Sequence, residues 1–489
     1  MSRYNMTLLT DLYELTMMQG YFNNKTNEKV VFDVFYRKNP SGSAYAICAG
    51  LDQVIDYIKN QTFEKEDIEY LRSTGFFNEP FLEYLSTFKF TGDIYAIPEG
   101  TVVFPKEPLL KVVAPIMEAQ LVETAILNII NHQSLIATKA SRVDYAAGGG
   151  VMEFGLRRAQ GPDAGVYGAR AAVIGGCVGT SNVLAGKMFD IPVKGTHAHS
   201  WIMSFKTELE AFRNYAMAYP DNCLLLVDTY DTLKSGVPHA IQVFDEMKAK
   251  GIKSKLYGIR LDSGDLAYLT KKARKMLDDA GHKDAIISAS SDLDEYVIES
   301  LQRQGAKITS WGVGTNLITS ADCPAFGGVY KLAAIQQEDG TFKPKIKVSE
   351  NIEKVTNPGN KTVFRLYDNA TGKIKADLIA LADETYSGDN DLMIFDPIAT
   401  WKRTYLEAGT YTVRELLVPV FIEGKCVYES PAVMDIRDYC AKELNTLWDE
   451  SRRFVNPQEV YVDLSKPLFE LKNELLDGVH KFSERHPEQ

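Results

Sequence analysis

The sequence predicts an α/β protein in which an irregular (β/α) barrel of the TIM-like type is joined to an α+β sandwich domain and a helical C-terminal tail. Three observations lead to this prediction. β-rich and helical runs alternate between about residues 151 and 319, most of the β-rich runs end in polar or glycine-rich sequence, and strand-like segments flank the region on both sides. Alternating β and α units are typical of a parallel sheet, open or closed.

The barrel region contains seven candidate strands separated by helical or loop segments. In a typical helical segment, Gly236–Lys250, apolar Val237, Ile241 and Phe244 recur every three or four residues, and Gly251 follows as a stop signal. Chemistry in such barrels sits where the strands end. The candidate strands are Val151–Arg157, Gly175–Gly179, Ile191–Thr196, Asn222–Asp228, Lys255–Asp262, Asp284–Ala289 and Lys307–Gly314.

A chain of 489 residues is too long for one ordinary core, since domains usually hold about 100–200 residues. About a hundred residues of strands on each side of the barrel region cannot easily form two independent sheets, so we expect the two flanks to join into one domain. The sandwich domain would comprise residues 1–140 and 326–430, the barrel 141–325, and the helical extension 431–489. The second flank is predicted to form hairpins from Gly328–Gln336, Phe342–Val348, Val363–Tyr367 and Ile374–Leu381.

Hydropathy, net charge and cysteine usage disfavour a membrane protein, a nucleic-acid-binding protein and a disulfide-rich protein. No apolar run approaches the roughly 18–20 residues that span a bilayer, and no signal peptide is apparent, so we expect a cytoplasmic protein without a membrane partner. The net charge of −11 disfavours nucleic acid as a partner. The six cysteines are scattered without a Cys-x-x-Cys pair, which argues against a disulfide framework and fits a reducing compartment.

Two strand ends offer groups that recognise anions. Arg157 and Arg158 follow the first candidate strand, and paired guanidinium groups suit phosphate or carboxylate, although they could also be a solvated surface pair. Gly175–Gly179 and the following Thr180-Ser-Asn182 offer unobstructed backbone amides and a helix start, although small residues here could simply permit close packing.

The segment Gly195-Thr196-His197-Ala-His199-Ser contains two histidines at i and i+2, which face one side of a strand. Such a pair suits a metal, but no third histidine or cysteine stands at a suitable spacing. A histidine at a strand end can instead act as an acid, a base or a phosphate acceptor. One of the two could also be purely structural.

The run Gly258-Ile-Arg260-Leu-Asp262-Ser-Gly-Asp265 is the most concentrated motif. Arg260 and Asp262 alternate onto one face of a strand end, which places a cation for an anionic substrate beside a carboxylate for Mg²⁺ or ribose hydroxyls. Asp265 is expected to cap the next helix. Asp228, which ends an apolar run, is a further inward acid.

The last two units end in Ser288-Ala-Ser290 and Gly312-Val-Gly314-Thr315. The final loops of such barrels commonly form a phosphate-binding nest, because glycines let backbone amides approach the oxygens. The barrel mouth would then hold a terminal phosphate, a second polyanion, a metal ion and a small organic acid. Phosphoribosyl pyrophosphate with Mg²⁺ matches that inventory.

Several of these runs, in this order, resemble the nicotinate phosphoribosyltransferase family over nearly the whole chain. The matching runs are Leu9-Thr-Asp-Leu-Tyr13-Glu-Leu-Thr-Met, Phe35-Tyr-Arg-Lys-Asn-Pro40, Phe154-Gly-Leu-Arg-Arg, Gly195-Thr-His-Ala-His199-Ser, Gly258-Ile-Arg-Leu-Asp-Ser-Gly-Asp265, Gly312-Val-Gly-Thr315 and Gly327-Gly-Val-Tyr-Lys331-Leu.

The resemblance implies a barrel-plus-sandwich fold, a homodimer with shared active sites, and use of nicotinate, phosphoribosyl pyrophosphate, Mg²⁺ and ATP as co-substrate. It implies that Tyr13 of a second copy and Phe154 stack on the pyridine ring, and that Thr196 and Arg260 contact nicotinate. His199 would be the histidine that ATP phosphorylates, and His197 has no implied role. Arg157 and the nest formed by Ser288, Gly312, Gly314 and Thr315 would bind phosphates, with Asp262 or Asp228 available to Mg²⁺.

Four other functions are alternatives to this one. A nicotinamide phosphoribosyltransferase would need an aspartate in the stretch Gly179–Asn182, where Asn182 is the only candidate. A quinolinate enzyme would need more cations. A metal-dependent barrel lyase or hydrolase would need a ligand set around His197, His199, Asp228 and Asp262. A non-catalytic binding protein would not explain so many polar strand ends.

Overall fold

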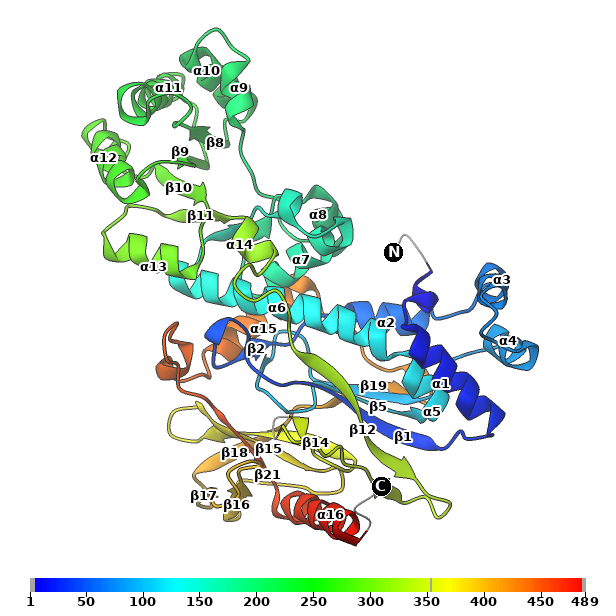
Figure 1. Ribbon diagram of the computed structural model, residues 1–489. Helices are drawn as coiled ribbons and strands as arrows, with labels where there is room; N and C mark the ends of the chain where they lie inside the picture. Colours follow the sequence, from blue (N-terminus) through cyan, green and yellow to red (C-terminus); the bar gives the residue numbers. More distant parts are fainter. Residues whose placement is uncertain (1–4, 352–353, 486–489) are drawn as a thin grey trace. The chain divides into compact units, whose positions relative to one another are not determined.

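The computed structural model describes residues 5–351 and 354–485 (Figure 1). These residues fold into two compact units that are interleaved in the sequence, because the chain leaves the first unit, builds the second and then returns. No helix in the described part of the chain is both long and apolar enough to cross a bilayer. Unit 1 comprises the described residues within 1–135, 325–431 and 439–489, and unit 2 comprises residues 136–324 and 432–438.

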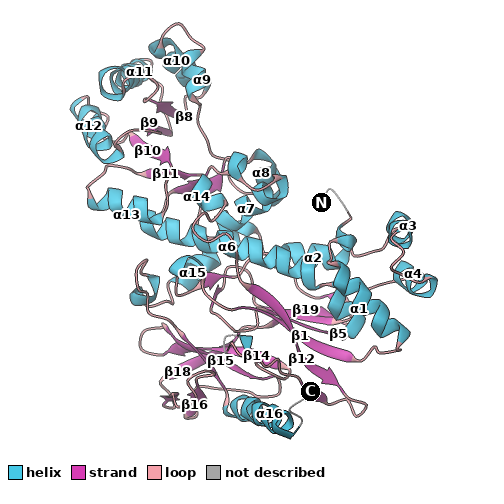
Figure 2. Cartoon of the chain, in the orientation of Figure 1, coloured by secondary structure: helices cyan, strands magenta, loops and turns pink. Residues whose placement is uncertain are grey.

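Unit 2 is built on a curled six-stranded sheet in which every pair of neighbouring strands is parallel (magenta strands in Figure 2). This sheet and the helices between its strands confirm the predicted α/β fold. The strands, in spatial order, are β7 (Gly179–Thr180), β6 (Val151–Glu153), β11 (Ser310–Val313), β10 (Ile286–Ser291), β9 (Leu256–Leu261) and β8 (Asn222–Leu226).

The prediction of a strand at Ile191–Thr196 is wrong. The segment makes a single parallel bridge, between Val193 and Thr180. Pro192 has no N–H to donate, so only its carbonyl takes part, accepting from the Thr180 amide at 3.0 Å. The sheet therefore ends at β7 on one side and at β8 on the other, and no hydrogen-bonded ladder between described residues joins these two edges.

The helices of unit 2 follow the strands and start where side chains cap them. Asp265 accepts from the amide of Tyr268 at 2.9 Å, and Asp294 accepts from the amide of Val297 at 2.8 Å, so both satisfy donors that a helix start leaves open. These elements are η3 (Leu156–Arg158), α7 (Pro162–Ile174), α8 (Val183–Phe189), α9 (His199–Met203), α10 (Glu208–Ala218), η4 (Thr232–Gly236), α11 (Val237–Ala249), α12 (Leu266–Asp279), α13 (Glu295–Arg303) and α14 (Thr315–Ile318).

Unit 1 contains a seven-stranded sheet whose centre joins distant parts of the chain. Strand β1 pairs antiparallel with β12, almost 300 residues later, and with β5 on its other side. The strand is buried over almost its whole length, which explains its nearly continuous apolar sequence. The sheet consists, in order, of β13 (Phe342–Pro344), β12 (Gly328–Gln336), β1 (Lys29–Tyr36), β5 (Leu110–Pro115), β3 (Asp93–Ala96), β19 (Val418–Ile422) and β20 (Lys425–Cys426).

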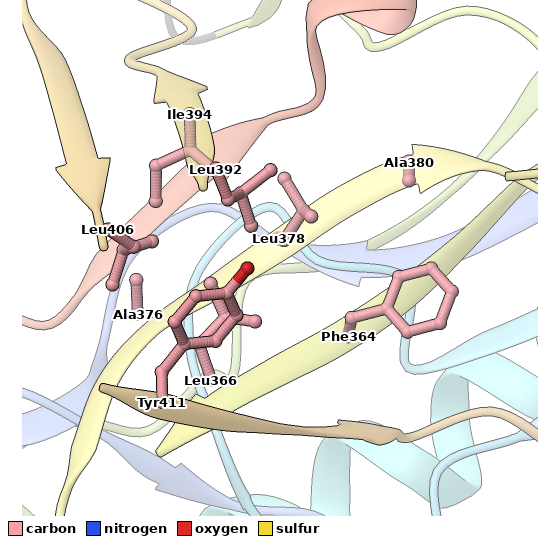
Figure 3. Close-up of a cluster of buried hydrophobic side chains, with 9 residues drawn as sticks. All are labelled: Phe364, Leu366, Ala376, Leu378, Ala380, Leu392, Ile394, Leu406 and Tyr411. Carbon is pink, nitrogen blue, oxygen red and sulfur yellow. The ribbon is translucent and has the colours of Figure 1, made fainter. Parts of the chain in front are cut away.

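A second sheet of unit 1 is held together by a cluster of buried side chains that includes Phe364, Leu378 and Tyr411 (Figure 3). The predicted hairpin is confirmed: β14 and β15 pair antiparallel, and Asp368 accepts from the amides of Ala370 and Thr371 in the turn. The strands, in order, are β17 (Arg403–Leu406), β16 (Leu392–Phe395), β21 (Tyr461–Leu464), β15 (Ile374–Leu381), β14 (Lys361–Asp368) and β18 (Tyr411–Glu415). Strands β2 (Ala46–Ile47) and β4 (Val102–Val103) form a separate pair.

The sequence had indicated a helical C-terminal tail, but the tail also contains a strand. Strand β21 lies between β15 and β16, where Asp463 and Leu464 are buried in the sheet. Pro457 precedes the strand and Pro467 follows it. The remaining helices of unit 1 are η1 (Met6–Leu8), α1 (Leu12–Asn23), η2 (Pro40–Gly42), α2 (Leu51–Lys59), α3 (Lys65–Ser73), α4 (Glu79–Ser86), α5 (Ile116–Leu121), η6 (Asp449–Arg452) and α16 (Lys466–Arg485). Helices α6 (Glu123–Ala147) and α15 (Val433–Leu444) contribute to both units.

Candidate active site

The carboxyl ends of the parallel strands surround a cavity of about 450 Å³ in unit 2. Its size is typical of a site for a small molecule. All residues that line it belong to unit 2, and nine of them are residues to which the sequence had assigned a catalytic or ligand-binding role. These nine are Phe154, Arg157, Thr196, His199, Arg260, Asp262, Gly312, Gly314 and Thr315.

Arg260 is fixed in place by hydrogen bonds on several sides. Its Nη1 donates to Oγ1 of Thr196 at 2.7 Å, and its Nε donates to Oγ of Ser290 at 3.0 Å. Its Nη2 lies 3.5 Å from Oδ1 of Asp262, which also accepts from the Ser290 hydroxyl. A guanidinium held in this way presents a rigid fork to a planar anion such as a carboxylate.

His199 begins helix α9 and lies among a hydroxyl and two carboxylates. Its Nδ1 is 2.9 Å from Oγ1 of Thr229. Its Nε2 is 4.0 Å from Oδ1 of Asp228 and 4.0 Å from Oδ2 of Asp262. The contact with Thr229 sets the orientation of the ring, so that Nε2 is the nitrogen that faces the two acids.

Asp228 positions its surroundings and is not itself exposed in the cavity. Its Oδ2 accepts from the amide of Asp262 at 2.8 Å and from the hydroxyl of Ser263 at 2.7 Å, which fixes the loop after β9. Its Oδ1 is buried without a hydrogen-bond partner in the described residues. A buried, unsatisfied carboxylate oxygen facing His199 suits a protonated imidazole or another cation.

His197 is separated from His199 in both contacts and environment. Its Nε2 accepts from the amide of Leu226 at 3.3 Å, and its ring packs edge-on against Tyr215 with 4.5 Å between centroids. Burial lowers the pKa of His197 to about 4, so this histidine is neutral and links the 195–199 loop to β8. The two histidines therefore do not form a joint metal site, and the described residues contain no cluster of three or more metal-binding side chains.

This neutral histidine predicts a pH dependence of stability. The folded-state pKa is lower than the ordinary value of 6.5, so the unfolded chain binds the proton more readily, and stability is lost as pH falls from about 6.5 towards 4. The loss should reach about 1 kcal/mol at pH 5.5. A His197→Gln variant should lack this component in urea titrations between pH 7 and 5.5. Equal pH slopes for the two proteins would show that His197 is not held neutral.

Phe154 explains why the end of β11 and the residue after it are rich in glycine. A Cβ at position 312 would lie 2.6 Å from the ring of Phe154, and one at position 314 would lie 3.3 Å from its carbonyl oxygen. The glycines therefore let the aromatic ring pack directly onto the end of β11. The expected use of their amides for phosphate stays a prediction.

Replacing Gly312 with alanine should displace the Phe154 ring and lower the free energy of unfolding by about 1–3 kcal/mol, the usual effect of overpacking. Urea denaturation measures this change. Gly20→Ala is the control, because a Cβ at this helical position of α1 meets nothing within 4 Å. Equal losses for both variants would contradict the packing account.

The residues beside the cavity that were not identified from the sequence include Thr229 and Glu153. Thr229 follows an acid already singled out, and nothing in its own sequence pattern marks it. Glu153 precedes Phe154 and is fully buried, accepting from the amide of Gly155 and from Oγ1 of Thr180, and burial raises the pKa of this carboxyl group. It ties the ends of β6 and β7 together. An acid just before an apolar-to-glycine strand end is the signal that could have marked it.

Three sequence-predicted residues lie elsewhere. Ser288 is completely buried, two residues nearer the start of β10, and Ser290 is the serine that lines the cavity. Asn182 is buried and caps α8, with its Oδ1 accepting from Ala185 and its Nδ2 donating to Gly165, so it does not face a ligand. Tyr13 lies on α1 of unit 1 with about half of its surface exposed, and its stacking role stays a prediction.

Known proteins are similar to this chain in both sequence and fold. Family models describe three consecutive parts of it: the nicotinate phosphoribosyltransferase N-terminal domain at residues 8–131, the nicotinate phosphoribosyltransferase family at residues 150–370, and the C-terminal domain at residues 360–472. Together these models cover most of the described residues.

Individual relatives agree with the family models. The chain is 46% identical to nicotinate phosphoribosyltransferase of Bacillus subtilis, over 99% of this chain and 97% of the relative, and 31% identical to the Homo sapiens protein of that name, over 96% and 97%. The crystal structure of human nicotinic acid phosphoribosyltransferase superposes with a TM-score of 0.82 at 29% identity, covering 96% of this chain and all of the other. The chain belongs to the nicotinate phosphoribosyltransferase family.

Proposed function

We propose that the protein joins nicotinate to 5-phosphoribosyl 1-diphosphate, giving nicotinate mononucleotide and diphosphate, and that it couples this transfer to ATP hydrolysis through phosphorylation of His199. The product would feed NAD biosynthesis. The observation that carries the proposal is the guanidinium of Arg260, held by Thr196, Ser290 and Asp262 at a cavity that also contains the Phe154 ring.

Nicotinate fits the chemistry of this part of the cavity. Its carboxylate pairs with Arg260 and the hydroxyl of Thr196, while its ring stacks on Phe154. By family resemblance, Tyr13 of a second copy of the chain covers the other face of the ring, which requires a homodimer. We also infer that the curled sheet works as a barrel, with its strand ends around one mouth, and that the two sheets of unit 1 form the expected sandwich.

Phosphoribosyl diphosphate fits the remaining groups. Arg157 offers a cation for the diphosphate, and Thr315 with the amides of Gly312 and Gly314 accepts the 5-phosphate. Asp262, whose carboxylate is partly exposed, is the residue best placed to hold Mg²⁺ or the ribose hydroxyls, with the buried Asp228 behind it. When bound, Mg²⁺ neutralises charge on the departing diphosphate.

The reaction itself needs little proton transfer. The pyridine nitrogen of nicotinate carries a free lone pair, so the protein has to align this nitrogen with the ribose carbon C1 and stabilise positive charge on the ribose. Asp262 is the carboxylate that we assign to that stabilisation. A phosphate on Nε2 of His199 would lie beside Asp228 and Asp262, and this added negative charge couples the state of His199 to the bound diphosphate.

The cavity disfavours the other functions considered. A nicotinamide enzyme would require a carboxylate in the 179–182 stretch, whereas Ser181 is the residue of this stretch that lines the cavity. A zinc-dependent lyase or hydrolase would require His197 and His199 to act together, but the backbone amide of Leu226 occupies Nε2 of His197. We also assign the protein to the cytoplasm. All six cysteines are free thiols in the structure, as is usual in a reducing compartment.

A product assay tests this function. The purified protein is incubated with nicotinate, phosphoribosyl diphosphate and Mg²⁺, with and without ATP, and nicotinate mononucleotide is measured by chromatography. We expect slow product formation without ATP, and faster formation with ATP together with ADP release. Absence of nicotinate mononucleotide under both conditions would refute the proposal.

A further inference from the structure

Unit 1 contains a separate cavity of about 130 Å³ that the proposed reaction does not use. It lies against β1 and α16 and is closed by three loops, near residues 106, 356 and 398. The volume is about ten times the roughly 10–15 Å³ that one water molecule requires. Its charged lining consists of Lys106, Lys361, Lys472 and Asp33.

The single carboxylate in this lining is already paired. Nζ of Lys361 lies 2.7 Å from Oδ2 of Asp33, and both side chains are buried. Nζ of Lys361 also donates to the carbonyl of Gly359 at 2.7 Å. The charge of Asp33 is therefore balanced by Lys361 and does not compensate the second buried lysine.

Lys472 is that second lysine, and its hydrogen-bond partners are neutral. Its Nζ donates to Oδ1 of Asn357 at 2.9 Å and to the carbonyl of Pro397 at 3.3 Å, and only 7% of the residue is exposed. It has no carboxylate within ion-pair distance among the described residues. An ammonium group has three hydrogens, so one donor remains for a further acceptor.

The surroundings of Lys472 disfavour its charge. Burial, followed by the neighbouring Lys106, lowers the pKa of Lys472 to about 8; Lys361 acts in the same direction, and Asp396 opposes them. A buried cation in this situation either loses its proton or gains an anion. The cavity beside Lys472 has room for such an anion.

We propose that this cavity binds a small oxyanion, either inorganic phosphate or an organic carboxylate, which pairs with the ammonium group of Lys472. The amide nitrogen of Asn357, whose oxygen already accepts from Lys472, is a second donor for the anion. The rings of Phe35 and Phe469 lie in the wall and would pack against the apolar part of a carboxylate. The inference is independent of the reaction proposed for unit 2.

Crystals of the full chain soaked separately with phosphate and with benzoate test the site directly. We expect density for at least one of the two anions within hydrogen-bond distance of Nζ of Lys472. The arm that shows density identifies the source of the oxyanion. Density in neither arm, or density only in the cavity of unit 2, would overturn the proposal.

Calorimetric titration of the protein with the anion found in the crystals tests whether binding depends on the charge of Lys472. Lys472→Met should weaken binding at least tenfold, whereas Lys466→Met should bind as the wild type does, because Lys466 lies on the same helix but is exposed and paired with Glu470. If Lys472→Met does not fold, as judged by circular dichroism, Lys472→Gln replaces it. Equal affinity of the Lys472 and Lys466 variants would overturn the proposal.

A repeat of the titration in an Arg260→Gln background removes the cation that we assign to carboxylates in unit 2. The signal that depends on Lys472 should persist there. With benzoate as ligand, affinity should also fall as pH rises through about 8, where Lys472 loses its proton. Loss of the Lys472-dependent signal in the Arg260→Gln background would show that the anion binds in unit 2 instead.

Discussion

Replacing Arg260 with glutamine should lower kcat/KM for nicotinate by about 30-fold or more. Truncating one partner of a desolvated charge pair costs about 2–5 kcal/mol, and 1.36 kcal/mol corresponds to a factor of ten. Glutamine can still donate to a hydroxyl, so the loss reports the charge and the two-pronged geometry. The Arg260 side chain is only 15% exposed, so its guanidinium group is largely desolvated.

Two comparisons make the Arg260 result specific. Arg213→Gln is the matched control, because Arg213 forms an exposed ion pair with Glu246 on the surface of the same unit and should leave kcat/KM unchanged. Thr196→Val removes the hydroxyl that Nη1 contacts and should give a smaller loss, about tenfold. An Arg260→Gln enzyme with unchanged kcat/KM for nicotinate would exclude Arg260 as the carboxylate partner.

Replacing His199 with alanine should abolish ATP stimulation while leaving a slow transfer of the phosphoribosyl group. The remaining groups still bind both substrates, but no acceptor for the phosphoryl group of ATP stands between Asp228 and Asp262. Steady-state rates with and without ATP, and transfer of label from γ-labelled ATP to the protein, measure the two parts of this prediction. Label should appear on the wild type and be absent from the variant.

Neighbouring substitutions separate phosphorylation from simple disruption. His239→Ala is the control, because His239 pairs with Glu208 away from the cavity lining and should leave ATP stimulation intact. Thr229→Val removes the contact to Nδ1 of His199 and should reduce labelling without abolishing slow transfer. Undiminished ATP stimulation in the His199→Ala enzyme would show that another group accepts the phosphate.

Local sequence patterns were informative where one element decides the outcome. The strand ends at Arg260, Asp262 and Gly312 lie together because parallel strands place their carboxyl ends at one edge of the sheet, and alternation along β9 turns Arg260 and Asp262 to one side. The β14–β15 hairpin follows from its turn residues in the same way.

Sequence patterns failed where depth or a distant partner decides. Ser288 and Ser290 share a face of β10, and the depth of each position along the strand determines that Ser290 reaches the cavity and Ser288 does not. Strand β21 depends on vacant edges of β15 and β16, whose paired residues lie about 70–85 positions earlier in the chain, and no local pattern reveals such edges. The separate environments of His197 and His199 likewise depend on Leu226 and Thr229 from the next strand and loop.

The choice between a carboxylate and an amide tests the account of the cavity most directly. The wild-type protein is given equal concentrations of nicotinate and nicotinamide with phosphoribosyl diphosphate, Mg²⁺ and ATP, and both mononucleotides are measured. Arg260 and the absence of an acid in the 179–182 stretch predict a preference for nicotinate of about a hundredfold or more. Formation of nicotinamide mononucleotide at a comparable rate would contradict the account.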